Sequence, residues 1–214
     1  MVERPARPDL FLEDLAPGSE QDFVIARLHE GLEFSAMDLS GERLLDREVI
    51  ECRLAGAVLD EATLQRSRIR ETHLVDLQAT SLDIGAADLR DVEVADSRFG
   101  DLQLYDAELR RVQFMGCRLG YLNLRSAKVL DLSFTDCLID ELDLGSARVT
   151  RLAFQGCEVK CLSVGGSQLA EVDLRGAQLG EITGLSGRSG ATISPNQLQE
   201  LAPALAGQLG ISIA

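Results

Sequence analysis

A large apolar residue recurs at every fifth position through most of this chain. Counting in steps of five from Phe34 to Leu179, all 30 positions are large and apolar except Ala79. An α-helix would show a period near 3.6 and an ordinary β-strand a period of 2, so neither fits. The pattern predicts a solenoid in which the chain repeats one short extended step and one corner, and points one large side chain inward each time.

Two longer periods in the sequence indicate the cross-section of the solenoid. From Leu82 onward, the position two before each central residue alternates between large and small, as in Leu82 and Ala87, which gives a period of ten. A period of 20 relates the members of two sets: Phe114, Phe134 and Phe154; Cys117, Cys137 and Cys157. Twenty residues are four pentapeptides, so we expect a four-sided coil that stacks these residues in columns. At a strand spacing of about 4.8 Å, about seven and a half coils make a rod about 36 Å long.

The rhythm is broken near Ala79. Leu77 and Leu82 are both large, which interrupts the alternation, and the small Ala79 lies between them. Either Ala79 makes room for an additional leucine, or it marks a local bulge.

The two ends of the solenoid need caps, because they expose strand edges. We expect an N-terminal capping segment over residues 1–31, with residues 10–12, Leu15 and residues 23–25 over the first coil. The solenoid is expected over residues 32–181, and a linker, a helix and a cap over residues 182–214.

The expected C-terminal helix begins with a capping box. Ser194, Pro195 and Gln197 occupy its N-cap, first and third positions. Pro203 is expected to kink or split the helix, and residues 211–213 to form a short strand. The apolar side that would cover the last coil, and that is also our candidate dimer surface, consists of Leu198, Leu201, Leu205 and Leu209.

Charge and cysteine content restrict the classes of partner. The net charge of −14 argues against nucleic-acid binding through phosphates and against an anionic membrane, and it permits a basic partner. The first ten residues contain no apolar signal core, and no apolar stretch approaches 18 residues, so we expect neither secretion nor a membrane span. Five cysteines without a signal segment favour a reduced, cytoplasmic protein.

No residue pattern indicates catalysis, a cofactor or a bound metal. His29 and His73 have no triad or metal-ligand spacing and are expected at the surface or at an edge. The column of three cysteines resembles a metal ladder, but small buried thiols explain it better. Cys161 falls at a corner and is expected to be the most exposed thiol. A core filled by its own side chains leaves no pocket for a small substrate.

Acidic residues at the corners are the remaining candidate site. A partner-binding acidic face would consist of Asp60, Asp76, Asp96, Asp101, Asp136 and Asp140. Beside the column of Glu51, Glu71 and Asp91, however, the register also stacks Arg70, Arg90 and Arg110, which would cancel much of the field.

The repeat resembles the pentapeptide-repeat family. Units such as 57–61, 87–91 and 177–181 follow the pattern of a small residue, any residue, then Leu or Phe, and the resemblance covers roughly residues 32–181. The repeats with a large first residue, such as Leu102-Gln-Leu104, depart from it. The resemblance implies an all-β fold, namely a right-handed quadrilateral β-helix, to which the sequence adds a C-terminal α-helical cap.

The resemblance also suggests a function. The quinolone-resistance members of the family are acidic dimeric rods that resemble DNA and bind DNA gyrase. The first hypothesis is therefore a DNA mimic that binds gyrase and forms a homodimer through its C-terminus. The alternative is a protein-interaction scaffold or a structural solenoid. Nothing in the sequence supports an enzyme.

Overall fold

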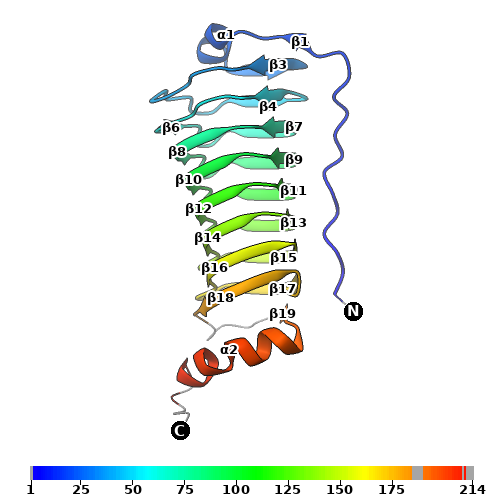
Figure 1. Ribbon diagram of the computed structural model, residues 1–214. Coiled ribbons are helices and arrows are strands. Elements are labelled where there is room, and N and C mark those ends of the chain that lie inside the picture. The colour runs from blue at the N-terminus through cyan, green and yellow to red at the C-terminus, as the bar shows by residue number, and fades with distance from the viewer. Residues whose placement is uncertain (1, 185–189, 209, 211–214) are drawn as a thin grey trace.

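The chain winds into a rod of stacked coils with a helix at each end (Figure 1). This computed structural model describes residues 2–184, 190–208 and 210. Every long strand pairs in parallel with the strand 20 residues away, as in Arg98 with Arg118. The 20-residue register runs from the pair Leu28 and Glu48 to the pair Ser163 and Thr183. The expected β-solenoid with four pentapeptides in each coil is confirmed.

Two parallel sheets form the walls. The 12-stranded sheet consists of β1 (Ala16–Pro17), β2 (Leu28–Glu30), β3 (Leu32–Ser35), β4 (Glu48–Ile50), β5 (Arg53–Ala55), β7 (Arg68–Val75), β9 (Asp88–Ala95), β11 (Glu108–Met115), β13 (Lys128–Thr135), β15 (Arg148–Gln155), β17 (Gln168–Asp173) and β19 (Ala191–Thr192). The seven-stranded sheet consists of β6 (Ala62–Thr63), β8 (Gln78–Asp83), β10 (Arg98–Gln103), β12 (Arg118–Asn123), β14 (Leu138–Asp143), β16 (Cys157–Ser163) and β18 (Ala177–Thr183). The helices are α1 (Glu20–Ile25) and α2 (Pro195–Gln208).

Two kinds of corner explain the ten-residue rhythm. Strands β10 and β11 continue through their corners, and the large side chains of Leu102 and Val112 point inward directly after them. The other two corners of the coil are turns, and the small side chains of Ala107 and Cys117 follow them. Small residues therefore accompany the turns, and large residues accompany the extended corners.

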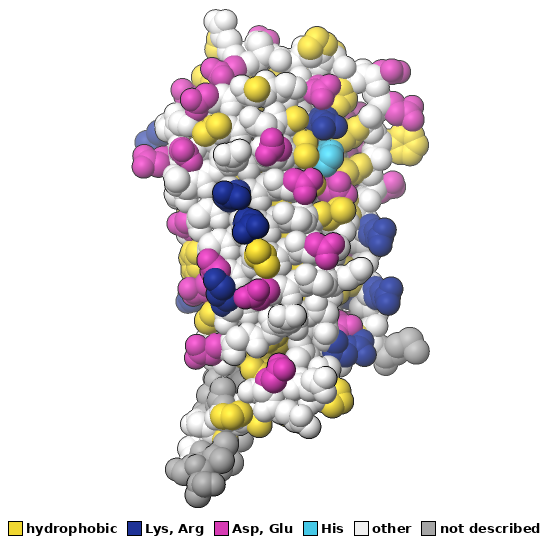
Figure 2. Space-filling model, in the orientation of Figure 1, with side chains coloured by type: hydrophobic (Ala, Val, Ile, Leu, Met, Phe, Trp, Pro, Cys, Tyr) yellow, Lys and Arg dark blue, Asp and Glu magenta, His cyan; other side chains and the backbone are white. Residues whose placement is uncertain are grey.

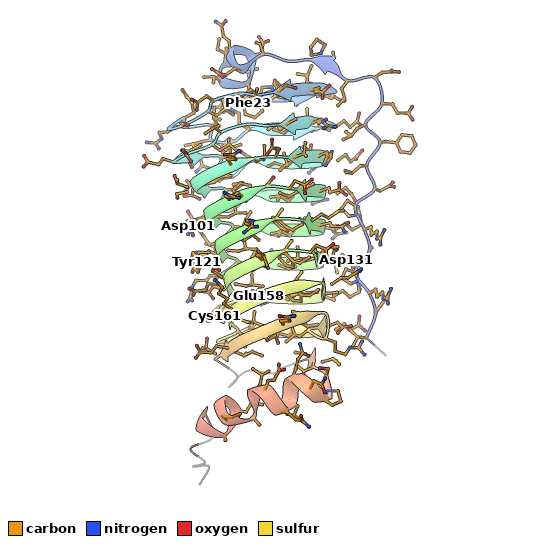
Figure 3. The ribbon with its side chains drawn as sticks, viewed as in Figure 1. Phe23, Asp101, Tyr121, Asp131, Glu158 and Cys161 are labelled. Atoms are coloured by element: carbon orange, nitrogen blue, oxygen red, sulfur yellow. The ribbon has the colours of Figure 1, made fainter. Side chains whose placement is uncertain are left out.

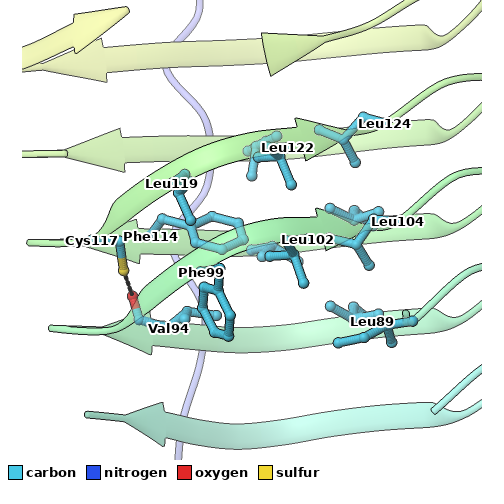
Figure 4. Close-up of a cluster of buried hydrophobic side chains, with 14 of the residues drawn as sticks. Leu89, Val94, Phe99, Leu102, Leu104, Phe114, Cys117, Leu119, Leu122 and Leu124 are labelled. Atoms are coloured by element: carbon cyan, nitrogen blue, oxygen red, sulfur yellow. Dashed lines mark hydrogen bonds between the residues drawn. The ribbon is translucent and has the colours of Figure 1, made fainter. Parts of the chain in front are cut away.

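The column of cysteines belongs to one of these turns. Cys117 Sγ donates to the carbonyls of Val94 and Met115, both at 3.4 Å (Figure 4). Cys137 and Cys157 bond the carbonyls two residues before them in the same way, at 3.3 and 3.4 Å. Each buried thiol thus satisfies a turn carbonyl, as the side chains of serines do elsewhere in such turns.

The core is aliphatic, with one aromatic column. The rings of Phe114, Phe134 and Phe154 stack with centroids 5.2 Å apart at each step. Around them, leucines from both sheets meet at the axis (Figure 4). The stacking follows directly from the 20-residue coil, because the three residues occupy the same place in successive coils.

The strands run without interruption past Ala79. Ala79 pairs with Phe99, and Leu82 with Leu102, so the bulge alternative is wrong. Leu77 and Leu82 are both buried. The other interpretation stands, in which the small residue leaves space for two leucines. A cavity of about 40 Å³ remains in this N-terminal half of the core.

The N-terminal cap differs from the expectation. Phe23 of α1 is buried against His29, with ring centroids 4.5 Å apart, while Phe11 is 74% exposed and does not cover the first coil. Strand β2 already pairs in the 20-residue register, so the coils begin ahead of residue 32.

The expected surface position of His29 is wrong, because His29 is only 1% exposed. One further step of five back from Phe34 reaches His29, which occupies the inward column that Val49 and Ile69 occupy in the next coils. A polar residue at an inward position hid this first repeat.

Helix α2 covers the last coil. Ser194 and Gln197 form the expected capping box: the Ser194 amide donates to Gln197 Oε1 at 2.8 Å, and the Gln197 amide donates to Ser194 Oγ at 3.2 Å. Gln197 Nε2 also donates to the carbonyls of Leu174 and Ala177, both at 2.7 Å, which fixes the helix on the coil below. The helix is continuous through Pro203, so the expected split is wrong.

The apolar residues of α2 do not all face the coil. Leu201 is buried and Leu205 packs against the core, whereas Leu198 is 51% exposed. Leu209 and residues 211–213 lie outside the described residues. Neither α1 nor α2, the helices in the described part of the chain, is long and apolar enough to cross a membrane.

The buried His29 predicts a pH-dependent stability. Burial, and then the positive charge of Arg47, lower the pKa of His29 below its usual 6.5. The unfolded chain therefore binds the proton first, and the free energy of unfolding falls as the pH drops below about 6.5, by at most about 1.4 kcal/mol per pH unit. Urea unfolding between pH 7.5 and 5 should show this slope, and His29→Leu should reduce it.

His73 supplies the control for this experiment. Its pKa is also lowered, chiefly by burial, so His73→Gln measures its separate share of the slope. An unchanged slope in His29→Leu would contradict the assignment to His29.

Candidate protein-binding surface

The open spaces that a partner can enter lie on the outside of the rod. The core holds a small apolar cavity of about 40 Å³, whereas a surface hollow of about 680 Å³ lies over the seven-stranded sheet. Within residues 2–184, 190–208 and 210, no three His, Cys, Asp or Glu side chains are arranged to hold a metal ion.

The six predicted acidic residues lie on or beside the seven-stranded sheet. Asp76, Asp96 and Asp136 form a column at one corner, and all three are exposed. Asp60 and Asp140 share a second column in the adjoining side of the coil, and Asp101 lies in β10 at the next corner. The structure thus brings the six residues to one side of the rod, in three columns.

Basic side chains interrupt this acidic side. Lys160 Nζ lies 2.6 Å from Asp140, and Asp60 accepts a bond from the Thr80 amide at 2.6 Å. Arg98 and Arg118 line the same hollow, between the acidic columns. Figure 2 shows acidic and basic side chains intermingled on the face toward the viewer. The surface is mixed in charge and does not form an unbroken acidic stripe.

Ion pairs follow a rule set by the coil. In most of them, the basic residue stands 20 positions after its acidic partner, one coil further along the rod. The pairs are Glu33 with Arg53, Asp46 with Arg66, Glu48 with Arg68, Asp91 with Arg111, Glu108 with Lys128, Asp131 with Arg151, and Asp140 with Lys160. The exposed pairs contribute little stability individually, but they neutralise the surface locally.

The expected stacking of Arg70, Arg90 and Arg110 is present in the strand register. Arg70 and Arg90 both bind Asp88, at 3.2 and 3.0 Å.

Two ion pairs with buried carboxylates lie one above the other along the rod. At one corner of the 12-stranded sheet, Arg111 binds Asp91 through two nitrogens, and Arg151 binds Asp131 at 2.6 and 2.8 Å. The side chains of Asp91 and Asp131 are only 10% and 5% exposed. Burial alone would raise the pKa of each carboxyl, but hydrogen bonds from the arginine and from a backbone amide outweigh it, and both pKa values are lowered.

The backbone amides come from the N-terminal segment, which runs down the outside of the rod. We call residues 2–12 the N-terminal arm. The Ala6 amide donates to Asp131 Oδ1 at 2.9 Å, and the Asp9 amide donates to Asp91 Oδ1 at 3.1 Å. Figure 3 places Asp131 on the side along which the arm passes. Sequence reasoning missed this contact, because it assigned the segment to the cap.

The arm and the coils match in length. Ala6 and Asp9 are three residues apart, while Asp131 and Asp91 are two coils apart. Three residues of polyproline II backbone rise about 9 Å, and two coils rise about 10 Å. Pro5 and Pro8 have this same three-residue spacing and favour the extended conformation. This proline spacing is the sequence signal for the arm.

Cys161 is the half-exposed thiol, as expected, and the other four cysteines are buried. It lies on the edge of the rod with Asp101 and Tyr121 (Figure 3). Burial, and then the carboxylates of Glu141 and Glu181, raise the pKa of Cys161. The thiol therefore stays protonated at neutral pH, which disfavours a nucleophilic role.

Comparison with known proteins identifies the repeat. Residues 107–183 match the family model described as a pentapeptide repeat region. A trypsin-treated variant of QnrB1, a plasmid-mediated fluoroquinolone resistance protein, is similar over 94% of this chain and 98% of its own, with 15% identity and a TM-score of 0.39. No curated protein sequence matches.

A second solved structure is also similar. It is HetL, a pentapeptide repeat protein involved in heterocyst differentiation regulation from the cyanobacterium Nostoc sp. strain PCC 7120. It aligns over 78% of this chain and 91% of its own, with 16% identity and a TM-score of 0.38.

Removing the two carboxylates that hold the arm should release it. Because hydrogen bonds to charged groups contribute about 1.5–3 kcal/mol, we expect Asp91→Ala with Asp131→Ala to speed amide exchange in residues 2–12 roughly tenfold or more. Hydrogen exchange with mass spectrometry measures this directly. Asp46→Ala, which breaks only the exposed pair with Arg66, should leave the arm unchanged. Equal exchange in all three proteins would show that the arm is held by other contacts.

Proposed function

We propose that this chain, in which residues 107–183 match a pentapeptide repeat region, acts without catalysis, as a scaffold that binds a protein partner on the outside of the rod. The observation that carries the proposal is the mixed charge of the side that contains Asp60, Asp76 and Asp140. A surface with interspersed charges of both signs suits a specific protein partner, since such a partner can match both signs.

The filled core supports the same proposal. Side chains occupy the axis from Phe34 to Ile182, and the remaining cavity of about 40 Å³ is much smaller than a typical small-molecule site of about 300–1,000 Å³. The free thiols of all five cysteines agree with a reducing, cytoplasmic location, which forms part of the proposal.

Site-specific cross-linking tests the scaffold. A photoreactive amino acid placed at exposed positions such as Gln78 and Glu158 should yield one stoichiometric partner in the native cell. The same substitution at Arg148, on the 12-stranded sheet, serves as the matched control. If no position gives a stoichiometric adduct, the chain does not act as a scaffold.

A second candidate function is an acidic mimic of DNA that binds DNA gyrase. The net charge of −14 and the exposed column of Asp76, Asp96 and Asp136 favour it. The adjoining side carries the basic residues Arg98, Arg118 and Lys160. They weaken this candidate, because the backbone of duplex DNA carries only negative charge.

A supercoiling assay with purified gyrase separates the two functions. A DNA mimic should inhibit supercoiling or protect the enzyme from a fluoroquinolone. The triple variant in which Asp76, Asp96 and Asp136 become Asn should lose that effect. No effect of the wild-type protein would remove this candidate and leave the scaffold.

We further propose that the chain forms a homodimer through its C-terminus. Leu198 is 51% exposed, and its helix α2 lies at the end of the rod, where a second copy can cover it. Light scattering at micromolar concentration should give a mass near twice 23.2 kDa, and Leu198→Glu should give the monomer. A monomeric wild-type protein would contradict this.

A further inference from the structure

The hollow over the seven-stranded sheet is lined by an arginine pair that breaks the ion-pair rule of the coil. Arg98 and Arg118 are register neighbours in β10 and β12. Twenty residues before Arg98 stands Gln78, and twenty before Arg118 stands Arg98 itself. In the described part of the chain, neither guanidinium lies within ion-pair distance of a carboxylate. The acidic group that seven other basic residues receive from the coil before is missing here.

This arrangement costs stability in the isolated protein. Like charges on directly opposite residues of neighbouring strands repel each other, and the two strands are about 4.8 Å apart. The chain carries 35 acidic residues and a net charge of −14, yet it places two exposed arginines together. An occupant with a carboxylate would relieve the repulsion and restore the pairing.

The hollow beside the arginines is elongated and shallow. It follows the seven-stranded sheet from Val58 to Lys160, over successive coils, and encloses about 680 Å³. Its floor includes Gly100 and Gly120, where a Cβ would lie only 2.5 and 2.4 Å from the carbonyl oxygens of Thr80 and Gly100. No larger residue fits there without a shift of the backbone, so the backbone next to the arginines stays open to an approaching chain.

The ends of the hollow restrict the occupant further. Asp60 lies at one end, and Asp140 and Glu158 lie toward the other. A polyanion such as nucleic acid would meet carboxylates at both ends and is disfavoured. Leu138, which pairs with Arg118 in the sheet and is 41% exposed, offers an apolar contact next to the charged pair.

We propose that this hollow binds an extended protein segment that carries one or two carboxylates at its centre, between uncharged or basic residues, and places an apolar side chain on Leu138. The carboxylates accept hydrogen bonds from Arg98 and Arg118, whose planar guanidinium groups match a carboxylate in geometry. The backbone bonds of the sheet are already formed between coils, so recognition comes from side chains. The inference rests on the proposed scaffold function and names the chemistry of its partner.

Selection from a displayed library of random 12-residue peptides tests the inference on the full chain. We expect peptides selected on the wild-type protein to be enriched in central Asp and Glu compared with peptides selected on the Arg98→Gln, Arg118→Gln double variant. The matched control is Arg66→Gln with Arg68→Gln, which removes two exposed arginines that have partners in Asp46 and Glu48. The control should select the same peptides as the wild-type protein.

A selected peptide then gives the quantitative result by fluorescence anisotropy. Its affinity should fall roughly tenfold or more on the double variant, and by a similar factor when its own acidic residues become amides. The control variant should bind it as the wild-type protein does.

Three outcomes would overturn the assignment: no enrichment of carboxylates, binding that survives the loss of both arginines, or tighter arginine-dependent binding of a single-stranded oligothymidylate of twelve nucleotides. A cross-linked partner whose binding does not depend on Arg98 and Arg118 would leave the scaffold function standing and refute only this site.

Discussion

The inward side chain at the centre of each pentapeptide supports every other feature of this protein. It fills the axis, and its stacking on the residue 20 positions away aligns the strands of successive coils. The phenylalanine column shows the consequence most directly, since three rings repeat at 5.2 Å. The axis is closed by its own side chains, and the coil decides which surface residues become neighbours.

The same register organises the surface electrostatics. Most ion pairs join a carboxylate to a cation one coil further along, so charge is neutralised in columns parallel to the axis. Two places on the surface stand out. At one corner, the buried carboxylates of Asp91 and Asp131 bind an arginine and also hold the N-terminal arm. On the seven-stranded sheet, Arg98 and Arg118 follow each other with no carboxylate between them. At the first place, a column of surface residues binds a segment that lies outside the coils. The second place is suited to bind one.

The periods of five, ten and 20 predict the solenoid, its four sides and the alternation of large and small inward residues, because each inward position reports directly on packing. The capping box at Ser194 was also predictable, since its hydrogen bonds are local. His29 was missed because a polar side chain occupies an inward position, where its burial depends on stacking with Phe23. The arm was missed because its partners lie more than 80 residues away along the chain. The columns of acidic residues follow from the 20-residue period. That Arg98 and Arg118 lie between these columns depends on how neighbouring columns are placed on the same side of the rod.

The coil of 20 residues also limits how such a rod can change its length. Inserting one pentapeptide keeps a large residue at every inward centre, but it would set large first residues at the turns and small ones at the extended corners, and it would break the phenylalanine column if placed within it. It would also rotate everything beyond it by one side, and every ion pair that spans the insertion would lose its partner. Only steps of a whole coil keep the axis and the charged columns together, and such a step must lie beyond Asp131 if the arm is to keep its contacts. The central inward positions thus repeat every five residues, the corners repeat every ten, and the charged columns repeat every 20. The columns on the surface therefore restrict changes in the length of this rod to whole coils more strictly than the core does.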